Sequence, residues 1–135
     1  MKILATDLDS EVLDTASKAV YSSSEVDGLE EVVVKNYFQK GSDGKEVKVK
    51  DKVTKFVHYK RLNLLEKWPM NGPFDFIFCR NVVIYFDKPT QKVLFDRYAD
   101  LLNVGGYLFV GHSENLSGIT DRFENLGNTT YRKIR

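Results

Sequence analysis

The stretch Phe74-Asp75-Phe76-Ile77-Phe78-Cys79-Arg80-Asn81 is a mostly apolar run that stops abruptly at two polar residues. A run of this length and composition is typical of a strand buried on both faces, as in the middle of a parallel sheet. The pair Arg80-Asn81 then falls at the carboxyl end of that strand. We therefore predict a buried parallel strand over residues 74–79 with a polar, charged tip.

A helix and a second strand are predicted after this tip. Pro89 fits the first turn of a helix that runs to about Leu102, and Gly105-Gly106 is expected to end it. Residues 107–110 are the next strand, and the last residues are expected to form a hairpin around Gly127-Asn128. Strand, helix and strand in this order indicate an α/β fold. The side chains expected to face inward from the helix are Val93, Leu94, Tyr98, Leu101 and Leu102.

The N-terminal residues show the same order of elements. Residues 2–6 form a short apolar run that ends at Asp7-Leu8-Asp9. Ser10 is in a position to cap a helix that extends to about Val20. A strand, an acidic tip and a helix make half of a βαβ unit.

Residues 32–61 have a different pattern. After a turn cluster at residues 41–44, Glu46-Val47-Lys48-Val49-Lys50 alternates polar and apolar side chains, which is typical of a half-buried antiparallel strand. Residues 55–59 are a further strand candidate. We therefore divide the chain into an α/β domain of residues 1–31 and 62–135 and a small antiparallel β-subdomain insert of residues 32–61.

The composition is that of one globular, cytoplasmic domain. Of the 135 residues, 42% are hydrophobic and 29% are charged. No apolar run reaches the roughly 20 residues that a membrane span requires. The single cysteine, Cys79, excludes an internal disulfide and favours a reducing compartment.

The charge is unevenly distributed along the chain. Nine of the 20 basic residues but only three of the 19 acidic ones lie in residues 32–61. This basic insert in an acidic remainder is either a solvated face or a surface that docks a partner.

Polar residues at strand ends are the candidate ligand contacts, because ligands bind beyond the carboxyl ends of the strands in open α/β sheets. They are Asp7, Asn63 and the pair Arg80-Asn81. An acid after a strand commonly accepts hydrogen bonds from ribose hydroxyls, but Asp7 and Asp9 together also fit a metal pair or a helix cap.

Arg80 and Tyr85 each allow two interpretations. Arg80 either lies in a ligand cleft or forms a structural ion pair with an acid such as Glu114, since an unpaired buried charge is costly. Tyr85 is either a site residue or a core aromatic, although the neighbouring Phe86 suits the core better. Cys79 is expected to be a small buried side chain rather than a reactive thiolate.

The longer string Phe78-Cys79-Arg80-Asn81-Val82-Val83-Ile84-Tyr85-Phe86-Asp87 is similar to a family signature. Together with Ala5-Thr6-Asp7-Leu8-Asp9, Asn63-Leu64, Gly105-Gly106 and Gly111-His112-Ser113-Glu114, it resembles the CheR family over essentially the whole chain. Members of this family are S-adenosylmethionine-dependent methyltransferases that esterify glutamate side chains of bacterial chemoreceptors. The resemblance implies that S-adenosyl-L-methionine is the cofactor and S-adenosyl-L-homocysteine the product.

The resemblance also implies a role for each matching residue. Asp7 corresponds to the acid that binds the cofactor ribose, and Asn63-Leu64 to the pair that flanks the adenine. Arg80-Asn81 corresponds to the pair beside the methionine portion of the cofactor. Tyr85 resembles the tyrosine that lines the site where the substrate glutamate enters. Arg80 and Tyr85 are therefore the expected catalytic residues, and no metal is expected.

The family begins with a helical domain, a first sheet strand and a glycine-rich loop, and no residues that match them precede the strand at residues 2–6. The resemblance therefore implies a partial Rossmann-like class I methyltransferase sheet that lacks its first strand. We expect the chain alone to bind S-adenosylmethionine poorly and to be inactive. We also expect it to self-associate through the exposed apolar seam of the sheet.

The cytoplasmic domain of a chemoreceptor is the expected partner. The insert is similar to the family's β-subdomain, which in some members docks a peptide at the receptor's C-terminus. The alternative function is a binding module that docks a receptor tail or a regulatory protein through this insert. We expect no membrane insertion. Nucleic acid is not expected to bind, because the aromatic residues between the lysines of residues 35–60 occupy core-like positions and the remainder of the chain is acidic.

Overall fold

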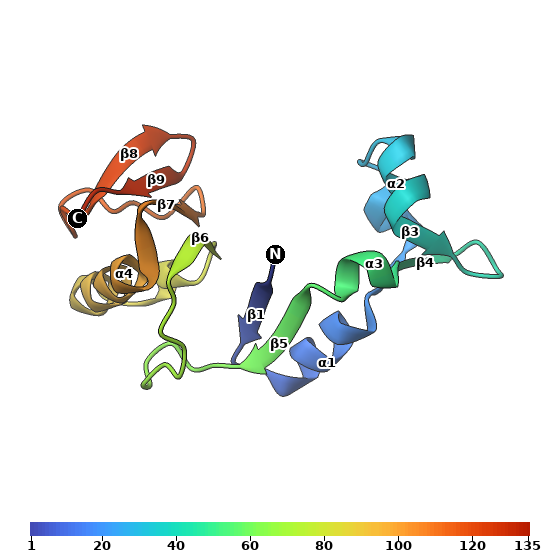
Figure 1. The fold of residues 1–135 in the computed structure, drawn as a ribbon, viewed down its shortest axis with the longest axis horizontal. Coiled ribbons are helices and arrows are strands. Elements are labelled where there is room, and N and C mark those ends of the chain that lie inside the picture. The colour runs from blue at the N-terminus through green and yellow to red at the C-terminus, as the bar shows by residue number, and fades with distance from the viewer. The chain divides into compact units, whose positions relative to one another are not determined.

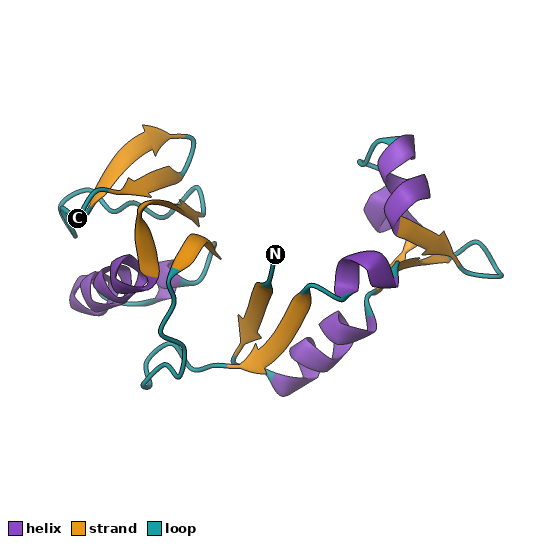
Figure 2. Cartoon of the chain, viewed as in Figure 1, coloured by secondary structure: helices purple, strands orange, loops and turns teal.

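The computed structural model describes all residues from Met1 to Arg135, which form two compact units, residues 1–68 and residues 69–135. Both units contain helices and strands (Figures 1 and 2), so the predicted α/β class is confirmed at this level. None of the helices combines the length and the apolar character that crossing a membrane requires.

The elements of the two units differ in their order. The first unit contains, in chain order, β1 (Ile3–Asp7), α1 (Ser10–Lys18), β2 (Val20–Ser22), η1 (Ser23–Val26), α2 (Glu31–Tyr37), β3 (Phe38–Lys40), β4 (Glu46–Val49), α3 (Asp51–Thr54) and β5 (Val57–Arg61). The second contains β6 (Phe74–Cys79), η2 (Val83–Tyr85), α4 (Lys88–Leu101), β7 (Leu102–Val110), β8 (Phe123–Gly127) and β9 (Thr130–Lys133).

The predicted strand, acidic tip and helix at the N-terminus are confirmed, but the helix has a different cap. Asp9 rather than Ser10 is the N-cap of α1, because its carboxylate accepts a hydrogen bond from the Glu11 amide at 2.8 Å. The helix ends at Lys18, where the next residue, Ala19, adopts a left-handed conformation with a φ of 55°.

β1 and β5 form a two-stranded parallel sheet, in which Ile3 lies opposite Val57 and Asp7 opposite Arg61. The prediction that the strand near residues 55–59 belongs to the antiparallel insert is therefore wrong. Alternation of side chains indicates that a segment is a strand, but its partner is decided by where the chain returns after α3. As a result, the carboxyl ends of β1 and β5 lie side by side.

The antiparallel sheet of the first unit has the strand order β2-β4-β3. Its middle strand confirms the alternation predicted for residues 46–50, because Val47 is buried while Glu46 and Lys48 are exposed. Three elements that the alternation did not predict also belong to this part of the chain: β2, η1 and α2.

The second unit contains a four-stranded sheet in the order β6-β7-β9-β8. β6 and β7 are parallel, as predicted, and Cys79 lies opposite Val110. β8 and β9 form the predicted C-terminal hairpin and pair antiparallel. Because β6 and β7 run in the same direction, the segments that begin at Arg80 and at Gly111 leave the same edge of this sheet.

Helix α4 packs through one side, which carries Leu94, Phe95, Tyr98, Ala99 and Leu101. Val93 was expected on this side but is 56% exposed, because the buried positions follow a helical spacing that leaves residue 93 beyond the edge of the stripe. The prediction that Gly105-Gly106 ends the helix is also wrong. The backbone becomes extended at Leu102, so both glycines lie inside β7.

β6 is buried on one face only, which corrects the prediction of burial on both. Its buried face carries Cys79, which contacts Tyr98 of α4. On the opposite face Phe76 and Phe78 are 48% and 63% exposed. Phe78 stacks on Phe109 of β7 with 4.4 Å between the ring centroids and contacts Phe76 edge-on at 5.6 Å.

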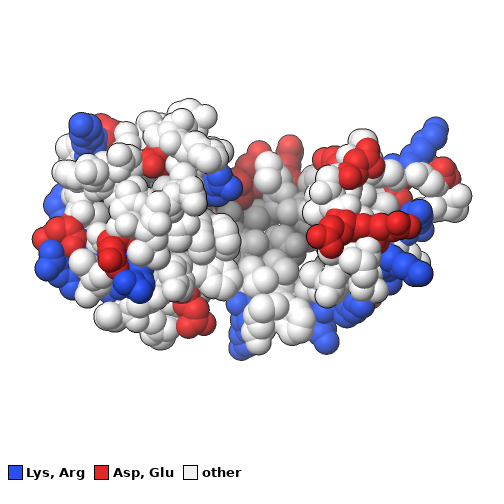
Figure 3. Space-filling model, turned by 90° about the horizontal axis from the view of Figure 1, so that it is seen from above, with Lys and Arg blue, Asp and Glu red and all other residues white.

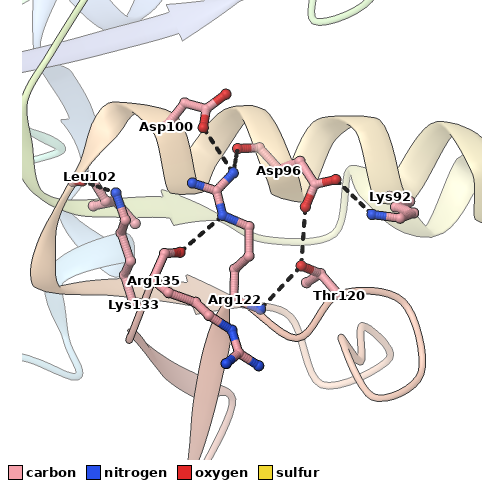
Figure 4. A network of polar contacts seen from close by, with 8 residues as sticks. All are labelled: Lys92, Asp96, Asp100, Leu102, Thr120, Arg122, Lys133 and Arg135. Atoms are coloured by element: carbon pink, nitrogen blue, oxygen red, sulfur yellow. Dashed lines mark hydrogen bonds and ion pairs between the residues drawn. The ribbon is translucent and has the colours of Figure 1, made fainter.

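Polar contacts fasten the segment between β7 and β8 to α4 (Figure 4). Arg122 donates to the Asp96 carbonyl at 3.0 Å and pairs with the Asp100 carboxylate at 2.8 Å. The Thr120 hydroxyl donates to the Asp96 carboxylate at 3.1 Å. These contacts hold the C-terminal end of a segment that begins at the edge of the sheet beyond β7.

Candidate functional site

Two polar side chains lie at the carboxyl ends of β1 and β5. Asp7 is the last residue of β1, and its main-chain carbonyl accepts a hydrogen bond from the Leu62 amide at 2.9 Å. Asn63 and Leu64 follow directly and are both half-buried. The parallel register therefore brings Asp7 and the pair Asn63-Leu64 to one edge of this sheet.

The carboxylate of Asp7 is exposed and only partly used by the fold. One oxygen accepts a hydrogen bond from the Asp9 amide at 2.9 Å, and the other has no partner within the chain. Asp9 itself caps α1, which selects the helix-cap alternative for that residue. The Asn63 side chain accepts a hydrogen bond from the Leu65 amide at 3.0 Å. Asp7 thus presents a carboxylate oxygen that can accept hydrogen bonds from hydroxyl groups.

In the second unit, Arg80 and Asn81 follow β6. Arg80 is exposed and makes no hydrogen bond or ion pair within the chain. The alternative that it pairs with Glu114 is therefore wrong, because main-chain amides occupy both oxygens of that carboxylate. Asn81 has a φ of 60°, a left-handed conformation that asparagine adopts more readily than most residues.

Glu114 is the central residue of this region, and the sequence reasoning did not find its role. Its side chain is buried, at 7% exposure, and it accepts hydrogen bonds from four main-chain amides. One oxygen accepts from Asn81 and from Gly111, both at 2.7 Å. The other accepts from Val83 at 2.8 Å and from Ile84 at 3.2 Å. The sequence signals for this role are an acid placed shortly after the end of β7 and its place in the motif Gly111-His112-Ser113-Glu114.

Gly111 permits the close approach of these two segments. A Cβ atom on Gly111 would lie 2.2 Å from the side-chain oxygen of Asn81, and 3.0 Å from both the Asn81 amide nitrogen and a Glu114 carboxylate oxygen. These distances are shorter than van der Waals contact, so only glycine fits this position without a shift of its neighbours.

Tyr85 ends the 3-10 turn η2 and is 81% exposed. The alternative that it is a core aromatic is therefore wrong, whereas Phe86 is half-buried. The Gln91 side chain donates to the carbonyls of Val83 and Phe86, both at 3.0 Å, which fixes the turn from the side of α4. Tyr85 thus projects from a turn whose backbone is bonded on two sides.

Cys79, directly before Arg80, is buried as predicted. Its sulfur lies 3.0 Å from the Tyr98 hydroxyl. Burial raises the pKa of the Cys79 thiol, and the Tyr98 hydrogen bond offsets this only in part. Burial also raises the pKa of the Tyr98 hydroxyl. Both groups are neutral at physiological pH and belong to the core beneath the strand end.

The predicted site residues thus form two groups. Asp7, Asn63 and Leu64 lie at one sheet edge in the first unit, and Arg80, Asn81 and Tyr85 are carried by one segment of the second. A cavity of about 350 Å³ in the second unit is lined by residues of η2, of α4 and of the segment after β7, and Arg80, Asn81 and Tyr85 do not line it. The second group lies instead on exposed segments.

Comparison with known families interprets this arrangement. The family model described as the SAM-binding domain of CheR methyltransferase matches residues 1–132. The chain belongs to the CheR methyltransferase family. This confirms the resemblance predicted from the motifs. The mixed α/β structure with several sheets is consistent with the S-adenosylmethionine-binding domain of CheR methyltransferases.

Curated relatives agree with the CheR assignment. The chain is 44% identical over 134 residues to a probable chemotaxis protein methyltransferase of Rhizobium etli, a match that covers 97% of this chain and 50% of that protein. It is 43% identical to the chemotaxis protein methyltransferase of Salmonella typhimurium and 42% identical to that of Escherichia coli. Each of these two matches covers 96% of this chain and 46% of the relative. The chain therefore spans about half the length of the curated relatives it matches.

Proposed function

We propose that the whole protein transfers a methyl group from S-adenosylmethionine to glutamate side chains of a chemoreceptor, with S-adenosylhomocysteine as the second product. The observation that carries this proposal is the match of the CheR family model to residues 1–132. The chain also has polar residues at strand ends, namely Asp7 in the first unit and Arg80-Asn81 in the second. The names of the relatives, chemotaxis protein methyltransferases, support the choice of substrate.

We assign the adenosine portion of the cofactor to the group at the ends of β1 and β5. The free carboxylate oxygen of Asp7 suits a ribose hydroxyl, because an ionised carboxylate accepts strong hydrogen bonds. The half-buried side chains of Asn63 and Leu64 at the same edge suit the contact with the adenine ring. The donors and acceptors present therefore fit the cofactor.

We assign the methionine portion and the substrate glutamate to Arg80, Asn81 and Tyr85. The guanidinium of Arg80 has no partner within the chain, which leaves it free to bind a carboxylate. The exposed hydroxyl of Tyr85 can donate to the substrate carboxylate and orient it. Arg80 and Tyr85 are the proposed catalytic residues.

The proposed reaction demands little of the protein beyond orientation. Bound S-adenosylmethionine supplies an electrophilic methyl group on a sulfonium sulfur. A glutamate side chain is ionised at neutral pH, so no general base is required. Arg80 and Tyr85 have to hold the carboxylate oxygen in line with the methyl carbon, within about 3–3.5 Å, and keep water out.

Replacing Asp7 with asparagine is expected to weaken the binding of S-adenosylhomocysteine to the whole protein by about tenfold. The physical reason is the loss of a charge-assisted hydrogen bond to the ribose. Isothermal calorimetry measures the effect. Asp14→Asn is the matched control, because Asp14 is an exposed acid of α1 that only pairs with Lys18.

Equal affinities of the two variants would contradict the assignment of Asp7, and no binding by the unaltered protein would contradict the proposed function. The same experiment on residues 1–135 alone tests our proposal that this part binds weakly and does not turn over. The reason is that residues 1–135 match only about half the length of the curated relatives, so this part lacks what the rest of the whole protein contributes to the site. Low-micromolar affinity of residues 1–135 would overturn that proposal.

The proposed partner is the cytoplasmic domain of a chemoreceptor, attracted in part by the basic residues of the antiparallel sheet. On the face seen in Figure 3, acidic side chains lie between the basic ones, so this attraction depends on individual lysines. Lys48 is a suitable one, because it is exposed in the middle strand. Lys50 is less suitable, because its ammonium group also donates to the Lys35 carbonyl at 3.1 Å.

Lys48→Glu is expected to weaken receptor binding several-fold at low salt and to have a smaller effect at high salt, because exposed charges are screened. Surface plasmon resonance with the receptor's cytoplasmic domain at two salt concentrations measures this. Lys67→Glu, an exposed reversal outside the sheet, is the control. Equal effects of the two reversals would show that net charge alone matters and that the sheet is not a docking surface.

A further inference from the structure

The carboxylate of Glu114 is placed between two segments that leave the same edge of the sheet in the second unit. It accepts hydrogen bonds from the amides of Asn81, Val83 and Ile84 on the segment after β6, and from Gly111 at the end of β7. Three of the four donors thus belong to the segment that carries Arg80, Asn81 and Tyr85. No lysine or arginine forms an ion pair with Glu114.

We propose that Glu114 is a positioning residue for methyl transfer, which holds the segment of residues 80–85 so that Arg80 and Tyr85 project toward the ligands. This role rests on the proposed function and adds to it. Glu114 does not touch the ligands itself, because its oxygens are occupied by main-chain amides and its side chain is buried.

The chemistry of the side chain explains why a glutamate suits this position. A carboxylate offers about four acceptor sites and no donor, which matches four converging amide groups. Glutamine would turn an NH₂ group toward two of those amides, so donors would face donors and two buried amides would lose their acceptor. Aspartate is one methylene shorter and cannot span the same distance from its backbone.

The backbone of the segment is bonded to side chains at both of its ends. Asn81 has a left-handed conformation with a φ of 60°, and its amide donates to the Glu114 carboxylate at 2.7 Å. Gln91 fixes the far end of the turn through the carbonyls of Val83 and Phe86. Glu114 accepts hydrogen bonds from main-chain amides of the segment, and Gln91 donates to its main-chain carbonyls. The two side chains together therefore define the path of the segment.

Main-chain amides occupy both oxygens of Glu114, and Arg80 makes no ion pair within the chain. An ion pair between the two would hold Arg80 against the protein and lower its capacity to bind a ligand carboxylate. The arrangement therefore orders the segment and at the same time keeps its cation available.

The test compares Glu114→Gln with Glu124→Gln in the whole protein. Glu124 is an exposed acid of β8 that pairs with Arg132, so the same substitution there is the matched control. Hydrogen exchange followed by NMR is expected to become about tenfold faster, or more, at the amides of Asn81, Val83 and Ile84 in Glu114→Gln. The amide of Val110, which bonds to the Thr129 carbonyl, is expected to change less than twofold.

Measuring the rate of methyl transfer distinguishes a positioning role of Glu114 from a role in stability alone. Glu114→Gln is expected to lower kcat/KM about tenfold or more below its melting temperature, and Glu124→Gln to leave it unchanged. Arg80→Ala is expected to lower kcat/KM by a factor at least threefold smaller in Glu114→Gln than in the unaltered protein, because the segment is already displaced. Asp7→Asn is expected to lower kcat/KM by the same factor in Glu114→Gln and in the unaltered protein.

Three results would overturn the proposal. The first is unchanged hydrogen exchange at the three amides in Glu114→Gln, and the second is faster exchange with an unchanged kcat/KM. The third is that Glu114→Gln and Arg80→Ala lower kcat/KM additively. Should Glu114→Gln fail to fold, the unaltered protein still decides: unprotected amides at Val83 and Ile84 would overturn the proposal, and strong protection would support it. Failure of the proposed function is recognised separately, because S-adenosylhomocysteine would then not bind while the exchange data still report on Glu114.

Discussion

Replacing Phe95 with alanine is expected to lower the free energy of unfolding of residues 69–135 by about 3–5 kcal/mol. Phe95 is 1% exposed and packs edge-on against Tyr98, with 6.2 Å between the ring centroids. Truncation removes the transfer free energy of the ring and leaves a void, and the surrounding close-packed side chains can fill such a void only in part.

Val93→Ala on the same helix is the control and is expected to change this free energy by no more than about 0.5 kcal/mol, because Val93 is largely exposed. Urea unfolding monitored by exchange of the Leu108 amide in β7 reports on the second unit alone. Similar decreases in the free energy of unfolding for Phe95→Ala and Val93→Ala would contradict the orientation of α4.

Replacing Gly111 with alanine is expected to be the most damaging single-methyl change near the site. The added Cβ would overlap the side-chain oxygen of Asn81 at 2.2 Å and crowd the hydrogen bond between Asn81 and Glu114. Overpacking of this kind costs about 1–3 kcal/mol. Because the displaced residue belongs to the proposed cofactor site, we also expect S-adenosylhomocysteine to bind about tenfold more weakly or worse.

The effect of Gly111→Ala is read by calorimetry with S-adenosylhomocysteine and by thermal unfolding. Gly28→Ala is its control, because a Cβ on Gly28 meets nothing within 4 Å and its φ is not positive. Normal affinity in Gly111→Ala would mean that Asn81 moves without consequence, and the assignment of Asn81 to the cofactor would then be wrong.

The two groups of site residues were predictable as strand-end residues, but their surroundings were not. Asp7 and Arg80-Asn81 interrupt apolar runs, and the sequence shows this directly. The sequence does not show that Arg80 is unpaired, nor that Glu114, 34 positions further along the chain, binds main-chain amides. The exposure of Tyr85 likewise follows from the turn imposed by Glu114 and Gln91.

By itself, the sequence determined the elements whose signals are local. The apolar run of residues 74–79, the alternation of residues 46–50, the proline at the start of α4 and the hairpin before the C-terminus are confirmed, and the motifs identified the family. Local signals suffice here because side-chain periodicity and backbone preference act over a few neighbouring residues.

Only the tertiary structure decided which elements meet. In the structure β5 pairs with β1, and Val93, Phe76 and Phe78 are exposed. The Glu114 carboxylate accepts hydrogen bonds from four main-chain amides. Each of these outcomes depends on contacts between residues far apart in the chain, which periodicity does not encode. A buried carboxylate has to find donors wherever the backbone supplies them, so its partners become known only when the fold is known.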